Sequence, residues 1–258
     1  MKIVVLIKEV PDTYGERKLN IETGLADRGA SEAVLDEIGE RSVEVALSHA
    51  DAHPGTEVVV LSMAPEGSAA TIRKGLAMGA GSAVHVVDPG LVGADTGLTA
   101  EVLAAALRRV GFDLVIGGNV STDGSGGVLP AMIAELLDVP SATSLNAVEI
   151  TEDRVSGERA SDAATMRVSA TLPAVISVTE RLPEGRFPNF KGIMAAKKKP
   201  FETVTLADLG IDPEAPEASR SIVIGVSEKP PREAGVKIVD EGDAGEQLAE
   251  FLAQNRLV

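Results

Sequence analysis

The first half of the chain alternates short apolar runs with segments whose apolar residues recur at helical spacing. The runs are rich in β-branched residues, which is typical of strands buried on both faces of a parallel sheet. This alternation predicts an α/β domain with helices covering a parallel sheet up to about residue 140. The expected strands are 2–10, 57–65, 82–88 and 112–118, and the expected helices are 31–50 (capped by Ser31), 66–80, 96–111 and about 129–137.

The pattern changes after about residue 140. Short alternating runs at 146–151, 153–159, 165–171 and 174–180 predict an antiparallel extension of the same domain. The chain is irregular from residue 183, and it then combines a small helix, a strand at 221–227 and a terminal helix at 245–258. We therefore expect an α/β domain over 1–182, a loop over 183–201 and an arm over 202–258 that packs on a partner.

Composition narrows the classes of function. The 24 basic and 39 acidic residues give a net charge of −15, the opposite of what a non-specific nucleic-acid or acidic-membrane binder needs. The absence of cysteine excludes a disulfide framework and thiolate metal sites. The first residues lack a signal-peptide pattern, and no run approaches the roughly 20 apolar residues of a membrane span. We expect a cytoplasmic protein that is not embedded in a membrane.

Residues 117–130, GGNVSTDGSGGVLP, join an expected buried strand to an expected helix. Ligands of open parallel sheets bind beyond the carboxyl ends of the strands, where this loop lies. Gly126 and Gly127 directly precede the helix, so the free N–H groups of its first turn and its dipole favour an anion. A solvated loop without a ligand explains the same residues equally well.

No lysine or arginine occurs between Arg109 and Arg154, so this loop has no cation of its own. A Walker A loop needs a lysine followed by Ser or Thr, which is missing here. Backbone amides and one helix dipole balance about one phosphate, which favours a monophosphate over a triphosphate. Asp123 fits a ribose or metal contact or, somewhat better, a turn cap. Leu6 and Met63 fit an apolar wall for a base or, more often, the core.

The residue pattern offers no catalytic constellation. His49, His53 and His85 lack the Cys or acid spacing of a metal site, and no Ser–His–Asp arrangement is visible. We therefore expect a protein without catalytic residues and without a metal.

Residues 183–201 form a second unusual stretch, with three of the six aromatic residues and a group of lysines in an otherwise acidic chain. Aromatics beside proline, glycine and lysine are a poor basis for a core, and they favour an exposed anchor with a basic rim, as protein interfaces use. The alternative is a loop that folds its phenylalanines back onto its own domain; a nucleic-acid patch is disfavoured by the net charge. The residues are Phe187, Phe190 and Phe201 with Lys191, Lys197, Lys198 and Lys199.

Together these features resemble the beta subunit of electron-transfer flavoprotein, and its actinobacterial members most. The resemblance runs in family order from residue 3 to residue 238, and GIMAAKKK is specific to the family. The matching stretches are VLIKEVPDT, LDEIGERSVEVAL, TIRKGLAMGA, GGNVSTDGSGGVLPAMIAELL, LPAVISVTE, RFPNFKGIMAAKKK and AGVKI.

The resemblance implies a Rossmann-like fold of the adenine nucleotide alpha-hydrolase type, with an antiparallel extension and a C-terminal arm that packs on an alpha subunit. The alpha subunit would hold most of the redox FAD, with Thr13 or Tyr14 of this chain near the flavin. This chain would bury a structural AMP, whose phosphate lies on the amides of Gly126 to Leu129. The implied AMP pocket comprises Leu6, the segment Asp36 to Gly39, Met63, Gly118, Asn119, Asp123, Gly124, Ser125, Gly126, Gly127, Val128 and Leu129.

Residues 183–201 match the family's recognition loop, which anchors partner dehydrogenases. Phe190 falls where mitochondrial relatives carry a leucine that enters a hydrophobic pocket of the dehydrogenase, and Phe187, Lys191, Ile193 and Met194 are expected to contact the same partner. The resemblance implies that the heterodimer carries electrons from acyl-CoA and other flavin dehydrogenases to a membrane quinone oxidoreductase.

Two alternatives remain beside that function. Electron-bifurcating members of the family place a second FAD in the AMP cavity, and a loop without cations favours AMP over that diphosphate. A non-redox nucleotide-binding sensor module would need only the loop 117–130 and would leave 183–201 unexplained.

Two stretches depart from the family pattern. Asp162 remains of an acidic and glycine signature, but AATM (163–166) replaces the rest, which we expect to loosen an intersubunit or edge-strand contact. Gly39 and Ser42 stand where relatives often have bulkier or polar residues.

Overall fold

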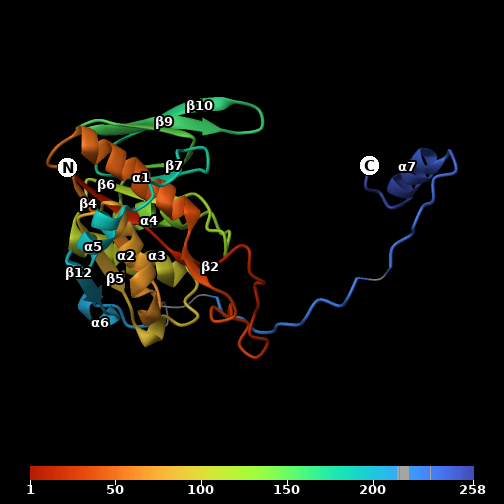
Figure 1. Ribbon diagram of the computed structural model, residues 1–258, viewed down its shortest axis with the longest axis horizontal. Coiled ribbons are helices and arrows are strands. Elements are labelled where there is room, and N and C mark those ends of the chain that lie inside the picture. Colours follow the sequence, from red (N-terminus) through yellow and green to blue (C-terminus); the bar gives the residue numbers. More distant parts are fainter. Residues whose placement is uncertain (214, 216–220, 233) are drawn as a thin grey trace. The chain divides into compact units, whose positions relative to one another are not determined.

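The computed structural model describes residues 1–213, 215, 221–232 and 234–258, which divide into two compact units, Met1–Ile224 and Gly225–Val258. The first unit contains a seven-stranded sheet in which every pairing is parallel (Figure 1). Its strands are β1 (Lys2–Leu6), β4 (Glu57–Met63), β5 (Ser82–Val86), β6 (Leu114–Gly118), β7 (Ser141–Leu145), β11 (Ala174–Val178) and β12 (Phe201–Val204).

The order of these strands is β12-β5-β4-β1-β6-β11-β7. The chain starts in the middle at β1, builds outward through β4 and β5, and then returns to the other side of β1 with β6. The direction of building thus reverses between β1 and β6, which makes this the topological switch point of the sheet. The predicted parallel α/β fold is confirmed.

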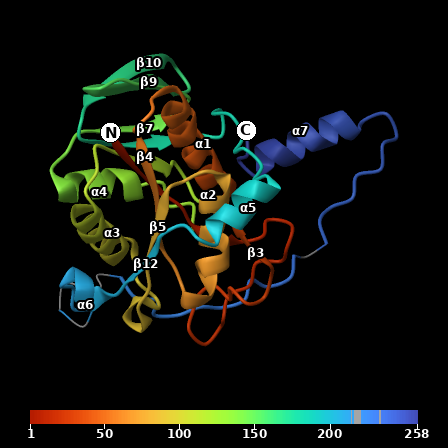
Figure 2. The same cartoon turned by 60° about the vertical axis from the view of Figure 1, so that its left-hand side comes forward.

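Helices cover both faces of the sheet, as the unbroken apolar runs predict. Ile3 and Val5 of β1 point to one face and pack in a core cluster with α1 and α2, while Val4 points to the other, with α3 and α4. Figure 2 shows the two helix layers on either side of the strands. The helices are α1 (Glu37–Ala52), α2 (Ala69–Met78), α3 (Thr96–Val110), α4 (Leu129–Leu137), α5 (Phe190–Ala196) and α6 (Leu206–Leu209), with 3-10 turns η1 (Glu66–Ser68) and η2 (Pro89–Leu91).

The first helix begins later than the sequence pattern predicts. β2 (Glu9–Pro11) pairs antiparallel with β3 (Ala33–Leu35), so the segment after Ser31 is extended. Helix α1 starts at Glu37, and the expected cap at Ser31 is wrong. The apolar residues of 33–35 continue the helical spacing by coincidence, and the pairing with β2 overrides it.

The antiparallel prediction holds for one part of the chain and is wrong for another. β8 (Ala147–Ile150), β9 (Arg154–Ala160) and β10 (Thr165–Thr171) form a three-stranded antiparallel sheet, with Asp162 in the turn between β9 and β10. Residues 174–178 instead form β11, which is buried at all five positions and parallel between β6 and β7. The sequence pattern does not predict strand β7, because SATSL has no apolar run.

The C-terminal part also differs from the expected arm. β12 pairs with β5 as an edge of the main sheet, so the compact unit extends past residue 202. The expected strand at 221–227 is wrong, since that segment has no regular secondary structure. The expected terminal helix is confirmed as α7 (Ala244–Gln254), in the second unit. Over the described residues, no helix is both long and apolar enough to cross a membrane.

Candidate functional site

A cavity of about 310 Å³ opens at the switch point of the sheet. It is lined by the ends of β1, β4 and β6 at Leu6, Met63 and Gly118, together with the starts of α1, α3 and α4. This is the carboxyl edge of the parallel sheet, where α/β proteins bind ligands. The loop 117–130 forms one side of the cavity, in the position that its place after β6 predicts.

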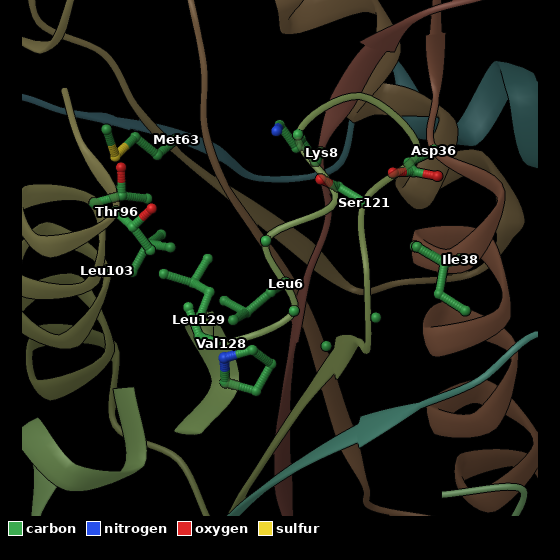
Figure 3. A pocket seen from close by; sticks show the side chains of 18 of the residues that line it. Leu6, Lys8, Asp36, Ile38, Met63, Thr96, Leu103, Ser121, Val128 and Leu129 are labelled. Atoms are coloured by element: carbon green, nitrogen blue, oxygen red, sulfur yellow. The ribbon is translucent and has the colours of Figure 1, made fainter. Parts of the chain in front are cut away.

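The two sides of the cavity differ in polarity (Figure 3). Met63, Leu103 and Leu129 contribute apolar surface on one side, with Thr96 beside them. Asp36, Lys8 and Ser121 contribute polar groups across from them. A ligand that combines a flat apolar ring with a polar chain matches this division.

The loop itself is shaped for backbone contacts. Ser125 and Gly127 have left-handed backbone angles (φ 52° and φ 70°), and the Ser125 N–H donates to the Ser121 carbonyl at 3.1 Å. Within the described residues, no side chain caps the start of α4, and Pro130 occupies its first turn. The first-turn N–H groups of α4 and its dipole therefore face the cavity end formed by Gly126, Gly127 and Val128.

The loop has no cation of its own, but two cations from earlier in the chain reach it. Lys8, at the end of β1, places its Nζ 2.7 Å from Asp123 Oδ1 and lines the cavity. Arg28, from the excursion between β2 and β3, lies 3.4 Å from Asp123 Oδ2. Burial raises the pKa of Asp123, but the hydrogen bond and charge of Lys8 outweigh it and lower that pKa to about 2. Asp123 thus pairs with both cations, a role that the spacing of residues in the sequence does not reveal.

Asp36 is the second carboxylate at the cavity, directly before α1. Its side chain is 1% exposed, and Oδ2 accepts a hydrogen bond from the Thr122 N–H at 3.0 Å. Burial raises its pKa above the ordinary value, against the opposing effect of the Thr122 backbone N–H. Hydrogen bonds from the Ile38 backbone and the Thr122 side chain act in the same direction as that of the Thr122 N–H.

Most of the residues that the resemblance assigns to a nucleotide pocket do line this cavity. The exceptions are Glu37, which lines a neighbouring cavity, and Asp123 and Ser125, which stabilise the loop from outside the lining. The lining residues are Leu6, Asp36, Gly39, Met63, Gly118, Asn119, Gly124, Gly126, Gly127, Val128 and Leu129. Sequence reasoning missed the contributions of Lys8, Thr96 and Leu103; Lys8 follows the end of β1 and Thr96 begins α3 at the same edge, whereas Leu103 lies inside α3.

A second cavity of about 370 Å³ lies on the far side of Asp36 and Thr122. Thr13 and Tyr14, the residues expected near a flavin, line it, and so does Phe187. Tyr14 is 99% exposed, which leaves its ring available to a partner. The nucleotide-pocket residues and the expected flavin-facing loop are therefore separated by little more than the Asp36 side chain and residues 121–122.

The stretch 183–201 presents apolar side chains to solvent. Phe187 and Phe190 are 92% and 79% exposed, and Ile193 and Met194 on α5 are also exposed, with Lys191 next to them. Helix α5 starts at Phe190, because the Asn189 side chain accepts a hydrogen bond from the Gly192 N–H at 2.8 Å. Both phenylalanines are exposed as expected; Phe190 begins a short helix, and Phe187 lies in the irregular segment before it.

Helix α5 is held tightly against α2. At Gly192, a Cβ atom would lie 2.5 Å from the Ala77 carbonyl oxygen, so only glycine permits this approach. The Arg73 guanidinium donates to the Ala196 carbonyl at 3.0 Å at the end of α5. In return, Lys199 Nζ donates to the Leu76 and Ala80 carbonyls at 2.8 and 2.7 Å at the end of α2.

The chain that leads into α5 is anchored on α1. Arg186 pairs with Glu44 at 2.8 Å and with Asp51 at 2.9 Å. The hydrogen bonds that Arg186 donates to the Glu44 carboxylate are the main reason that the pKa of Arg186 is raised. Arg41 also donates to the Leu182 carbonyl. Ion pairs and hydrogen bonds thus fix to α1 the segment that leads to the exposed apolar side chains.

Two residues of the expected anchor belong to the fold instead. Phe201 is half-buried at the edge of the sheet, with Arg73 4.5 Å above its ring and His85 at 6.0 Å. Lys199 serves the end of α2, and burial lowers its pKa. The exposed basic rim is therefore limited to Lys191, Lys197 and Lys198. Across the described residues, no group of three His, Cys, Asp or Glu could hold a metal ion.

Comparison with known proteins agrees with these features. The electron transfer flavoprotein domain matches residues 23–209. The beta subunit of electron transfer flavoprotein from Mycobacterium tuberculosis is 47% identical over 263 residues, covering 99% of each chain. The corresponding subunit from Bacillus subtilis is 32% identical over 254 residues, covering 98% of this chain and 96% of its own. Subunit CarD of the caffeyl-CoA reductase-Etf complex from Acetobacterium woodii is 32% identical over 216 residues, covering 83% and 82%.

Proposed function

The chain belongs to the electron-transfer flavoprotein family as a beta subunit, a flavoprotein component of electron transfer, and we propose that it works as a heterodimer with an alpha subunit. The alpha subunit holds most of the FAD in this proposal, and Thr13 and Tyr14 approach the flavin from this chain. The heterodimer accepts electrons from acyl-CoA and other flavin dehydrogenases and passes them to a quinone oxidoreductase. This chain contributes binding surfaces and no catalytic residues of its own.

The observation that carries this proposal is the exposed apolar surface of α5. Phe187, Phe190 and Met194 are exposed although the polar groups beneath them are fully engaged with α1 and α2. A soluble domain keeps such a patch only where a partner covers it, and a preformed anchor lowers the conformational cost of binding. A carrier that visits several dehydrogenases benefits from a rigid aromatic anchor of this kind.

We further propose that the cavity at the switch point holds a structural AMP. The positive charges of Lys8 and Arg28 both pair with the carboxylate of Asp123, which reduces the charge that they offer a ligand. The backbone amides at Gly126 to Leu129 then remain the source of positive potential, and they suit about one phosphate. Leu6, Met63 and Leu103 provide the apolar surface that a purine ring needs.

Two alternatives remain to be tested. One relative belongs to a caffeyl-CoA reductase complex, which keeps open an electron-bifurcating member with a second FAD in the same cavity. A diphosphate there would need further positive charge from the alpha subunit. A nucleotide-binding sensor module without electron transfer would leave the exposed surface of α5 without a use.

The test combines assembly with nucleotide identity. Co-expression with its alpha subunit is expected to give a yellow heterodimer whose flavin is reduced by an acyl-CoA dehydrogenase and its substrate. Acid extraction and mass spectrometry of the complex are expected to release FAD and AMP in equal amounts. Two FAD per heterodimer would favour the bifurcating alternative, and a colourless pair that does not associate would overturn the electron-carrier proposal.

A further inference from the structure

Two histidine rings are stacked at the carboxyl end of α1. His49 lies in the last turn of the helix, and His53 directly follows the helix as its cap. Positions four apart lie on the same side of a helix, and here the ring centroids are 4.1 Å apart with an angle of 17° between the ring planes. His53 is exposed and His49 is half-buried, so solvent reaches the pair. Neither residue lines the switch-point cavity or the second cavity.

A hydrogen bond fixes which nitrogen of His53 is free. The Nδ1 atom of His53 lies 3.0 Å from the His49 carbonyl oxygen. Because a carbonyl oxygen only accepts hydrogen bonds, Nδ1 carries a proton, and Nε2 of the neutral ring keeps its lone pair. Histidines that bind metal ions almost always donate their other N–H to such an acceptor, which orients the ring and makes it a stronger ligand.

The electrostatic surroundings suit a bound cation. Burial lowers the pKa of His49, and the positive charges of a protonated His53 and of the N-terminal amino group act in the same direction. His49 therefore gives up its proton readily, as a metal ligand must. The last carbonyl groups of α1 and its dipole place partial negative charge at this end of the helix, which favours a cation.

Two imidazole rings determine the class of ion. Imidazole nitrogen suits Cu²⁺, Ni²⁺ and Zn²⁺, whereas Mg²⁺ and Ca²⁺ prefer oxygen ligands. Histidines four residues apart on one side of a helix are a known pair of zinc ligands. Asp51, which lies between them in sequence, is engaged with Arg186 at 2.9 Å. Since no group of three His, Cys, Asp or Glu in the described part of the chain could hold a metal ion, water must complete the coordination.

We propose that His49 and His53 form a two-histidine site that binds one divalent transition-metal ion, Cu²⁺, Ni²⁺ or Zn²⁺, at the end of α1. The rings open from their stack so that one nitrogen of each contacts the ion, which for His53 is Nε2. Spacing to Cys or acidic residues does not predict this site, because the helical register of α1 brings the rings together. The site does not depend on the proposed electron-carrier function.

The first experiment is calorimetric titration of the full chain, without an affinity tag, with Zn²⁺ or Ni²⁺ alone. One ion per chain is expected, and Cu²⁺ should bind more tightly than either. Mg²⁺ in roughly hundredfold excess should not compete, since it prefers oxygen ligands. Absence of measurable binding, or equal competition by Mg²⁺, overturns the inference.

Variants assign the ion to the pair. His49→Gln and His53→Gln are each expected to weaken binding at least tenfold, because loss of even an outer partner of a metal ligand costs roughly tenfold to hundredfold in affinity. The double variant retains His85 and the N-terminal amino group, so undiminished binding in that variant overturns the assignment. Ser48→Ala, at an exposed neighbouring position, is the matched control and should bind as the unmodified chain does.

Electron paramagnetic resonance of the Cu²⁺ complex counts the ligands directly. Coupling to two imidazole nitrogens is expected in the unmodified chain and to one in each single variant; an unchanged spectrum in both single variants overturns the paired site. Zn²⁺ should raise the melting temperature of the unmodified chain and not that of the double variant, because an ion that binds only the folded state stabilises it. Thermal unfolding without metal shows that each variant is folded.

Discussion

The switch-point cavity and the surface of α5 use polar and apolar groups in opposite ways. In the cavity, the carboxylate of Asp36 is buried. At α5 and the segment before it, Phe190 and Phe187 are exposed, while the neighbouring charges of Arg186 and Lys199 are engaged. The first region buries a polar group, and the second exposes apolar ones. Each region therefore indicates the kind of molecule that completes it.

The comparison also separates two kinds of rigidity. The loop beside the cavity is held by ion pairs of Asp123 with Lys8 and Arg28, which depend on charge. Helix α5 is held by close backbone packing at Gly192 and by hydrogen bonds to helix ends. Variants that remove one kind of contact should leave the structure of the other region unchanged.

The largest effect is expected at the anchor. Phe190→Ala should lower the rate of electron uptake from a dehydrogenase at limiting concentration roughly thirtyfold, since a buried aromatic hot spot contributes about 2 kcal/mol or more. Nucleotide content and thermal stability should stay unchanged, because the ring is 79% exposed in this chain. Met166→Ala, an exposed apolar position on β10, is the control. Parallel loss of stability would place Phe190 in the core instead.

Gly192→Ala should disturb the seat of the same helix. A Cβ atom 2.5 Å from the Ala77 carbonyl forces α5 away from α2, and overpacking of this kind costs about 1–3 kcal/mol. Urea unfolding should show that loss, and electron uptake should fall with it, while AMP binding persists. Gly67→Ala, where an added Cβ would contact no described atom within 4 Å, is the control. Unchanged stability would show that α5 adjusts freely.

Asp123→Asn should weaken the cavity region in a pH-dependent way. Because the folded state lowers the pKa of Asp123 to about 2 from 3.8, its contribution is present above about pH 4 and is lost as the pH falls toward 2. We expect a loss of about 1–2 kcal/mol at pH 7 that disappears at the acid end, measured by urea unfolding across this range. Asp162→Asn, in the exposed β9–β10 turn, should show no such dependence. A loss that is independent of pH would contradict the ion-pair assignment.

A smaller effect is expected at the end of α2. Lys199→Met removes the donor to the Leu76 and Ala80 carbonyls and should cost about 1 kcal/mol in unfolding free energy. Lys198→Met, at the exposed neighbouring position, should cost almost nothing. Equal effects of the two substitutions would show that Lys199, like Lys198, belongs to the exposed basic rim and does not stabilise the end of α2.

The sequence predicts the parallel fold well because its evidence is local. Unbroken apolar runs such as 57–65 and 112–118 correspond to β4 and β6, and the glycine-rich loop lies at the predicted edge of the sheet. Residues 174–178 were misassigned because β11 is buried on both faces by neighbours distant in sequence. Alternation of apolar and polar residues alone does not distinguish an antiparallel strand from a central parallel one here.

The chemistry of the site was harder to predict. The cation beside loop 117–130 comes from Lys8, more than one hundred residues earlier in the chain, through the pairing of β1 with β6. The burial of Asp36 and its hydrogen bond from the Thr122 N–H join residues that lie far apart in sequence, which no spacing rule contains. Exposure of Phe187 and Phe190 was predictable from their proline and lysine neighbours, whereas burial of Phe201 depended on its pairing partner β5.

The path of the chain between β11 and β12 has a consequence for biosynthesis. These strands are five positions apart in the sheet, about 24 Å at normal strand spacing, and residues 179–200 bridge that distance carrying α5. The bridge is fixed at its far end only when β12 joins β5, a pairing between segments far apart in sequence. Pairings between segments far apart in sequence form slowly. A nascent chain that stops before residue 204 therefore lacks the edge strand that closes the bridge, and α5 is then held only by its contacts with α2 and by the anchored segment before it.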